Sequence, residues 1–151
     1  MSKISYIDNF TDWAESFKYH KDIEVRFSET DMFGHLNNTV AFVYFEQARV
    51  SFFGELGFMS DWLKKNSETI IVTADLQCDF MQQIYFGDTL EVYVKVAHFG
   101  NTSADLHYMA KTTDGRVCLT GRGRIVHISK KLGKPSPWTD EMINRLEEYS
   151  G

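Results

Sequence analysis

Five residues of kinds that serve catalysis or tight turns lie within a run of eight: Asp31, Gly34, His35, Asn37 and Asn38. The run directly precedes a long apolar stretch with a helical pattern. Asparagine can cap a helix, and a helix N-terminus offers unpaired backbone N–H groups and the positive end of a dipole. An acid beside such a helix end suits acyl transfer, because the acid could reach a carbonyl carbon while the N–H groups bind its oxygen. We therefore predict that Asp31 acts as nucleophile or general base and that the backbone N–H of Asn38 is the oxyanion donor.

The other three residues of the run each have a structural and a chemical interpretation. Gly34 is expected to permit a positive-φ turn between a strand and the helix rather than to contact a ligand. Histidine is the side chain most often used as an acid or base at physiological pH, so His35 could serve in that way, or it could orient the loop by hydrogen bonding. Asn37 is expected to cap the helix, although its amide could also hold a substrate carbonyl or a water molecule.

A second carboxylate, Glu46, is unexpected because it shares a helix face with apolar residues such as Phe42 and Val50. Burying an unpaired carboxylate there would be costly. Two explanations stay open. Arg49, close by on the same helix, could neutralise the charge, or Glu46 could face a pocket, where burial would raise its pKa and suit it to general acid–base work.

These side chains need a strand, a turn and a helix to position them. The alternation I-E-V-R-F predicts a strand over 23–27, and the apolar stretch predicts a helix from about 37 to 56. Because this helix has almost no polar face, it must be buried on most sides. Shorter helices are expected over 8–19, near 60–65 and after Pro137, the last with Thr139 or Asp140 near its start.

The remainder of the chain has strand patterns. Leu90, Val92, Val94 and Val96 alternate with polar residues, and Asp114-Gly115 marks a hairpin turn, so three consecutive strands should form an antiparallel meander. Gly121 and Gly123 lie inside the last of these strands, where glycine predicts a bulge or a sharp bend.

This order of elements predicts an α+β fold in which a curved antiparallel sheet wraps around a long central helix, with added N- and C-terminal helical segments. We expect a single domain over 1–151 with a core at about 22–129, because no repeat or boundary interrupts the pattern. A sheet has edges that need cover. Pairing with a second copy would cover one edge, so we predict a homodimer, with a homotetramer as the alternative.

Composition excludes several classes of function. The net charge of −5 argues against nucleic acid as a partner, since phosphate binding needs a positive surface. No apolar run approaches the length of a membrane span, so no membrane partner is expected. Cys78 and Cys118 lie in strand-like runs without the spacing of a zinc site, which predicts reduced thiols in a cytoplasmic protein and no metal.

The run V-R-F-S-E-T-D-M-F-G-H-L-N-N-T-V-A-F-V-Y-F-E-Q-A-R resembles the signature of hotdog-fold acyl-CoA thioesterases of the 4-hydroxybenzoyl-CoA thioesterase type. It is similar in particular to a bacterial branch with the motif T-D-x-x-G-H-V-N-N, followed by an aromatic-rich helix that carries E-x-A-R. The resemblance covers about 22–129, and it is far more specific for the fold family than for a substrate.

The resemblance implies a hotdog fold, an active site at a dimer interface, and hydrolysis of an acyl thioester without a metal or redox cofactor. The family's catalytic acid falls on Asp31, its oxyanion amide on Asn38, and its E-x-A-R glutamate on Glu46, whose importance varies between branches. Many members of the aryl and short-acyl branch have an aromatic residue or histidine where Asn38 stands, so their substrate preferences do not carry over.

The leading hypothesis is therefore an acyl-CoA thioesterase, in which His35 and Glu46 assist Asp31 and a small-molecule acyl-CoA is the substrate. One alternative is a thioesterase for acyl chains on acyl carrier protein. Another is a hotdog protein that binds acyl-CoA without hydrolysing it. Coenzyme A phosphates could contact a basic set near the last strand, although a solvated strand end explains the same residues: Arg122, Arg124, Lys130 and Lys131.

Overall fold

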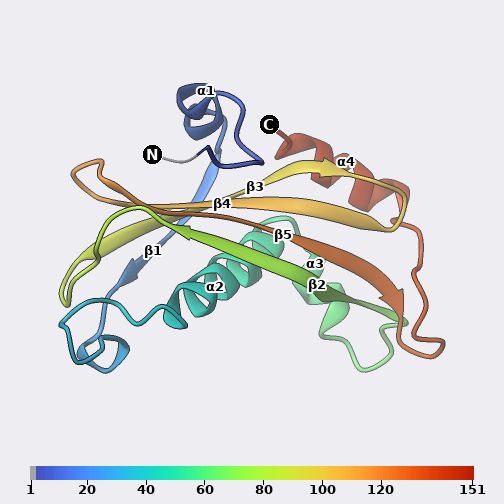
Figure 1. Cartoon of the computed structure of the whole chain (residues 1–151). Coiled ribbons are helices and arrows are strands. Elements are labelled where there is room, and N and C mark those ends of the chain that lie inside the picture. Colours follow the sequence, from blue (N-terminus) through green and yellow to red (C-terminus); the bar gives the residue numbers. More distant parts are fainter. Residues whose placement is uncertain (1–2) are drawn as a thin grey trace.

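The computed structural model describes residues 3–151. Five strands form one antiparallel sheet in the order β1-β3-β4-β5-β2, and the helix α2 (Val40–Glu55) lies on its concave side (Figure 1). The predicted α+β fold, a curved antiparallel sheet around a long central helix, is confirmed. Within the described residues, none of the helices combines the length and the apolar character needed to cross a bilayer.

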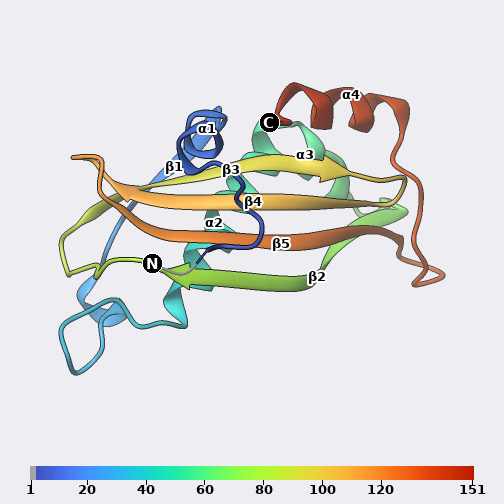
Figure 2. The same ribbon diagram turned by 45° about the horizontal axis from the view of Figure 1, so that its top comes forward.

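The strand order departs from the chain order in one place. The strands are β1 (Tyr19–Glu24), β2 (Thr69–Phe80), β3 (Thr89–Phe99), β4 (Ser103–Thr112) and β5 (Val117–Ser129). The last three form the predicted meander, and Gly115 in the turn between β4 and β5 has a φ of +94°. β2 pairs with β5 and so forms one edge of the sheet, which Figure 2 shows at its lower side.

The first strand is shifted from its predicted position. The prediction was 23–27, whereas β1 ends at Glu24 and a short 3-10 helix, η1, follows at Phe27–Glu29. The chain turns there because the Glu29 side chain accepts the backbone N–H of Arg26 at 2.9 Å. Ile23 and Val25 are buried, but the Phe27 side chain is 74% exposed, contrary to the pattern of alternation.

The helix α2 supplies the centre of the core. Phe45 is fully buried, and its ring stacks on Tyr108 of β4 with centroids 4.6 Å apart. Ala41 and Ala48 are also fully buried on this side, and their small side chains let the sheet approach the helix. Burying each large apolar side chain stabilises the fold by about 1.5–3 kcal/mol.

The opposite side of α2 is open in the single chain. Phe42, Val43 and Val50 are 37%, 47% and 46% exposed, and Glu46 and Gln47 lie among them as exposed residues. The prediction that this helix is buried on most sides is therefore wrong for one chain taken alone, because the five strands cover only one side.

The N-terminal helix α1 (Phe10–Glu15) packs on the outer face of the sheet. Trp13 and Phe17 form a second apolar cluster with Tyr93 of β3 and Met109 of β4. The indole N–H of Trp13 donates to Nδ1 of His107 at 2.9 Å, which fixes the helix to the sheet. This short helix is the observed form of the helix expected over 8–19.

The two remaining helices follow the central elements. α3 (Phe58–Trp62) directly succeeds α2 after Gly57, whose φ is +83°, and it corresponds to the helical piece expected near 60–65. α4 (Asp140–Glu148) begins at one of the two residues expected near its start, and the other, Thr139, is its N-cap, whose side chain accepts the N–H of Met142. The chain after α4 then runs along the part of β3 that β1 leaves unpaired, where Ser150 forms a parallel bridge with Val96.

Gly121 and Gly123 are needed for close packing and not for a bulge. Both belong to regular pairs in the ladders of β5, and the nearby irregularity lies between Thr73 and Asp75 of β2. A Cβ atom on Gly121 would lie 2.5 Å from Cε2 of Phe45. The sheet can therefore approach α2 this closely only because β5 has no side chain there.

Replacing Gly121 by alanine should destabilise the protein by about 1–3 kcal/mol, because the added methyl overpacks the core against Phe45 and the main-chain oxygen of Gln77. The matched control is Gly54→Ala in α2, where a Cβ would meet nothing within 4 Å and helix propensity favours alanine by up to about 1 kcal/mol. Urea unfolding of both variants measures the difference. Equal midpoints for the two variants would contradict the packing argument.

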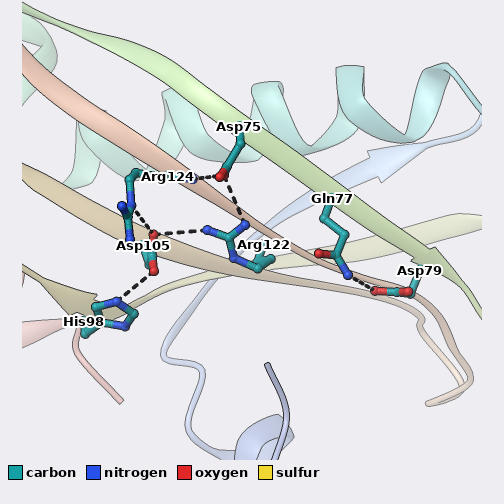
Figure 3. Close-up of polar contacts among 7 residues, drawn as sticks. All are labelled: Asp75, Gln77, Asp79, His98, Asp105, Arg122 and Arg124. Atoms are coloured by element: carbon teal, nitrogen blue, oxygen red, sulfur yellow. Dashed lines mark hydrogen bonds and ion pairs between the residues drawn. The ribbon is translucent and has the colours of Figure 1, made fainter. Parts of the chain in front are cut away.

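A network of charged side chains crosses the outer face of the sheet (Figure 3). Asp105 of β4 is only 6% exposed and binds His98 at 2.8 Å, Arg122 at 3.2 Å and Arg124 at 3.2 Å. Arg122 also pairs with Asp75 of β2 at 3.1 Å. Burial alone would raise the pKa of Asp105, but the hydrogen bond from Arg124 and the neighbouring positive charges outweigh it and hold this pKa below its ordinary value.

The network should make stability depend on pH in the acidic range. Because the folded-state pKa of Asp105 lies below the unfolded value, its contribution is present at neutral pH and is lost as the pH falls through the folded pKa. Asp105→Asn should therefore lower the free energy of unfolding by about 1–3 kcal/mol at pH 7, with the difference shrinking below about pH 4. Denaturant unfolding at several pH values checks this, and a difference that does not change with pH would refute the assignment.

Candidate active site

The motif loop is a small hairpin closed by backbone hydrogen bonds. The N–H of Asp31 donates to the carbonyl of His35 at 2.9 Å, and the N–H of Gly34 donates to the carbonyl of Asp31 at 3.0 Å. Gly34 has a φ of +80°, so it permits the turn as predicted. Thr30 and Leu36 form a bridge at the base of the hairpin, and Asp31 is the next residue along the chain toward the tip.

Asp31 is half-buried and takes part in its own turn. Its Oδ1 accepts the N–H of Phe33 at 2.9 Å, which is the side-chain to main-chain bond that aspartate commonly forms in a turn. The bond fixes the carboxylate at the tip of the loop and leaves Oδ2 without a hydrogen bond to any residue in 3–151. Oδ1 therefore stabilises the turn, and Oδ2 is available for chemistry.

His35 is held by the neighbouring segment through its backbone. It bridges to Tyr85, and the next residue, Leu36, donates its N–H to the carbonyl of Ile84 at 2.8 Å. The imidazole of His35 packs edge-on against the ring of Tyr85, with centroids 5.4 Å apart. Among the described residues the imidazole makes no hydrogen bond, so the loop is oriented by main-chain bonds and not by this ring.

The start of α2 leaves one backbone N–H free. Asn37 donates its N–H to the carbonyl of Glu29 at 2.9 Å, Thr39 donates its N–H to the Asn37 side chain at 3.0 Å, and Val40 donates to the Asn37 carbonyl at 3.0 Å. Asn38 lies between them, and its N–H donates to no other residue in the part of the chain described. The N-cap is Thr39, so the prediction that Asn37 caps the helix is wrong. The Asn37 side chain instead closes a turn just before the helix by accepting the N–H and the hydroxyl of Thr39.

Asn38 also lines a pocket of about 210 Å³. The other lining residues are Leu36, Leu119 of β5 and the segment 80–84 at the end of β2. Asp31, His35 and Glu46 do not line this pocket in the single chain. The structure thus places Asn38 at a cavity and Asp31 on the loop that precedes it. It does not bring all the predicted site residues around one cavity: Asp31, His35, Asn37, Asn38 and Glu46.

Glu46 lies on the open strip of α2, exposed and without an ion pair among residues 3–151. The alternative of neutralisation by Arg49 is not what the structure shows, because Arg49 points to the sheet side, is 8% exposed and donates to the Tyr108 hydroxyl at 3.1 Å. Whether Glu46 lines a pocket depends on what covers this strip, and its catalytic role stays a prediction.

The sequence interpretation missed Glu29, a buried carboxylate two residues before Asp31. Its Oε1 accepts the hydroxyl of Tyr44 at 2.8 Å and the N–H of Arg26 at 2.9 Å, and the Arg26 guanidinium lies 3.3 Å from Oε2. The spacing of Arg26 and Glu29 across three residues was the one local signal for the 3-10 turn. The tyrosine partner comes from α2 and could not be found from spacing.

The basic residues considered for phosphate contacts fall into two groups. Arg122 and Arg124 are engaged by Asp75 and Asp105 on the outer face of the sheet (Figure 3). Lys130 and Lys131 are exposed beyond the end of β5 and line a groove with the connection before β2. The two arginines are therefore parts of an ion-pair network, and the two lysines lie at a solvated strand end.

One group of side chains in the described residues has the composition of a metal site. Potential ligand atoms of His20, Asp22 and Glu91 lie within 4.8 Å of one another, on β1 and β3. His20 already contacts Asp22 at 3.1 Å, and Asp22 and Glu91 face each other across the strand pair. This group is on the edge strand β1 and its neighbour β3, and it contains none of the motif residues.

Comparison with known proteins shows the family to which the chain belongs. Residues 25–146 match the profile of the thioesterase-like superfamily. The uncharacterized protein YsmA of Bacillus subtilis is 44% identical over 138 residues, covering 91% of each chain. A predicted thioesterase from Bacillus stearothermophilus has a similar structure, with a TM-score of 0.77 and 32% identity over 88% of this chain and 96% of its own.

A thioesterase from Thermus thermophilus, whose structure contains coenzyme A and zinc, matches with a TM-score of 0.78 and 28% identity. The match covers 91% of this chain and 97% of that one. Together with the strand order around α2, these similarities identify the sheet and helix as a hotdog fold. The chain belongs to the thioesterase-like superfamily, and thioester hydrolysis is the general activity that its relatives support.

Proposed function

We propose that the protein hydrolyses an acyl-CoA thioester, with Asp31 as nucleophile or general base and the Asn38 N–H as oxyanion donor. The observation that carries this proposal is Asn38 at the start of α2, which lines a pocket of about 210 Å³ and whose N–H donates to no other residue in 3–151. The coenzyme A carrier is supported by the similarity to the Thermus thermophilus thioesterase that binds it. The loop of Asp31 is joined to this helix end through Glu29 and Asn37.

The proposed reaction uses water and the chain's own groups, in keeping with the prediction of no metal or redox cofactor. In the general-base route Asp31 takes a proton from water, and the oxygen attacks the thioester carbonyl carbon. The carbonyl oxygen becomes negative and is stabilised by the Asn38 N–H and by the positive end of α2. The C–S bond then breaks, the proton passes to the thiolate sulfur, and the free acid and coenzyme A leave.

The nucleophilic route starts from the same atoms. Asp31 attacks the carbonyl carbon, the C–S bond breaks, and coenzyme A leaves as the thiolate. Water then hydrolyses the resulting anhydride to the free acid and the Asp31 carboxylate, and the proton released in this step goes to the thiolate sulfur. In either route His35 and Glu46 assist as acid, base or holder of water, and the Asn37 side chain contacts the substrate. We further predict a cytoplasmic location, which the unpaired thiols of Cys78 and Cys118 support.

Asp31→Asn should lower kcat/KM for acyl-CoA hydrolysis by roughly 100-fold or more, because amide nitrogen can neither take a proton nor attack. The measurement is thiol release from acyl-CoAs graded by chain length and aromatic content. The control is Asp61→Asn, an exposed carboxylate paired only with Lys64 at 3.2 Å, which should stay within about twofold of the parent. An Asp31→Asn protein as fast as the parent would disprove the mechanism.

The same assay separates the alternative functions. Faster hydrolysis of acyl chains on acyl carrier protein than on coenzyme A would make the carrier protein the substrate. Binding of acyl-CoA without thiol release over the whole panel would show a non-catalytic ligand-binding protein.

We also propose that the protein forms a homodimer through β2 and the open strip of α2. β2 is an edge strand of 12 residues, and Val72 on it is 40% exposed. The strip formed by Phe42, Val43 and Val50 is apolar and uncovered within residues 3–151, so a second copy would bury it. The same contact would cover Glu46 and build a second wall near the pocket of Asn38.

Val43→Glu should shift the protein from dimer to monomer, because it places a charge in the centre of the proposed contact. Light scattering coupled to size exclusion measures the mass directly and distinguishes a tetramer as well. Leu132→Glu is the control, because Leu132 is 66% exposed on a loop outside β2 and α2 and should not change the mass. A parent that is monomeric at all concentrations tested would overturn the dimer.

A further inference from the structure

Glu29 is a buried anion with a complete set of partners. Glu29 is 7% exposed, and its carboxylate accepts hydrogen bonds from the Arg26 N–H, the Arg26 guanidinium and the Tyr44 hydroxyl. Burial raises the pKa of a carboxyl group, but these donors and the Arg26 charge outweigh it and hold the pKa of Glu29 below its ordinary value. At neutral pH Glu29 is therefore a fixed negative charge inside the motif loop.

The partner on α2 is a neutral donor. Tyr44 is fully buried, and burial together with the Glu29 carboxylate raises the pKa of its hydroxyl, so the proton stays on the oxygen. A buried carboxylate that lost this donor would be short of one hydrogen bond, which costs more than the bond itself contributes. The pair therefore fixes the position of η1 relative to α2.

The main chain of Glu29 reaches the other half of the site. Its carbonyl accepts the N–H of Asn37 at 2.9 Å, and Asn37 directly precedes the residue whose N–H is free. Asp31 lies two residues after Glu29 in the same loop. Glu29 thus contacts the central helix through its side chain, the segment of Asn38 through its carbonyl, and the loop of Asp31 through the chain itself.

We infer that Glu29 and Tyr44 form a positioning pair, which sets the distance and direction between the Asp31 carboxylate and the Asn38 N–H. The inference rests on the proposed function, because it assigns the pair a purpose in that reaction. Neither residue is expected to touch the substrate. Their contribution is geometric, and a misplacement of about 1 Å in such a site can lower the rate roughly 100-fold.

Tyr44→Phe tests the pair with the smallest possible change, because it removes one hydroxyl and keeps the ring in the core. We expect kcat to fall by roughly 10- to 100-fold while KM changes by less than about threefold, since substrate binding groups are untouched. Amide hydrogen exchange at Asn37 should become faster, because its acceptor carbonyl is no longer held. Adding Glu29→Gln to Tyr44→Phe should lower kcat by less than the product of the two single effects, because Glu29→Gln weakens the same charge-assisted bond that Tyr44→Phe removes.

Tyr93→Phe is the matched control. The Tyr93 hydroxyl donates to Oε1 of Glu91 at 3.2 Å, which is another tyrosine–glutamate bond, but it lies on the outer face of the sheet beside Phe17. This variant should leave kcat and the exchange at Asn37 unchanged. If Tyr44→Phe also leaves both unchanged and lowers only the melting temperature, the pair is a packing feature and the inference is wrong.

The two proposals fail in different ways. A parent protein that releases no thiol from any thioester overturns the proposed function. The amide exchange at Asn37 needs no turnover and is measured on the same proteins. Faster exchange in Tyr44→Phe than in Tyr93→Phe supports the positioning pair, and equal exchange overturns it.

Discussion

The structure depends on covering one helix that carries apolar side chains on nearly every side. The sheet covers one side of α2 by curving around it, and the two approach closely because β5 has glycine where Phe45 lies. The opposite side of the helix stays open in the single chain. Stacking of Phe45 on Tyr108 then fixes the rotation of the helix about its own axis. The rotation decides which residues face the strands and which form the open strip.

A fixed helix makes it possible to hold a short loop accurately. The motif loop has few apolar contacts of its own, and its exposed residues include Met32 and Phe33. Its geometry comes from main-chain bonds to the segment 84–85 and from the connection between Glu29 and α2. Because Asn37 uses both its side chain and its carbonyl to bind the next two N–H groups after Asn38, the N–H of Asn38 is the one left free in this turn.

Local sequence patterns were enough to predict some features of the structure, and they were not enough to predict others. The meander, the turn at Gly34 and the cap at Thr139 were predictable because each depends on residues adjacent in the chain. The edge position of β2 and the Glu29–Tyr44 bond depend on partners elsewhere in the sequence. The early end of β1 had only the spacing of Arg26 and Glu29 as a local signal. Arg49 illustrates the limit, since its nearest acid on the helix is Glu46 but its actual partner is Tyr108 on another element. The roles of Asp31, Asn38 and Glu46 in chemistry remain predictions, because placement alone does not measure a rate.

The number of free edges on the sheet limits how many chains could associate by strand pairing. β1 has only six residues, several of them charged and exposed, and the second half of β3 is occupied by the segment that follows α4. A strand edge of this kind resists pairing with a foreign strand. Of the edges in the described chain, β2 alone is both long and unpaired. If two copies paired through β2, as proposed, each would use its long unpaired edge, and none would be left for growth into fibres by edge pairing.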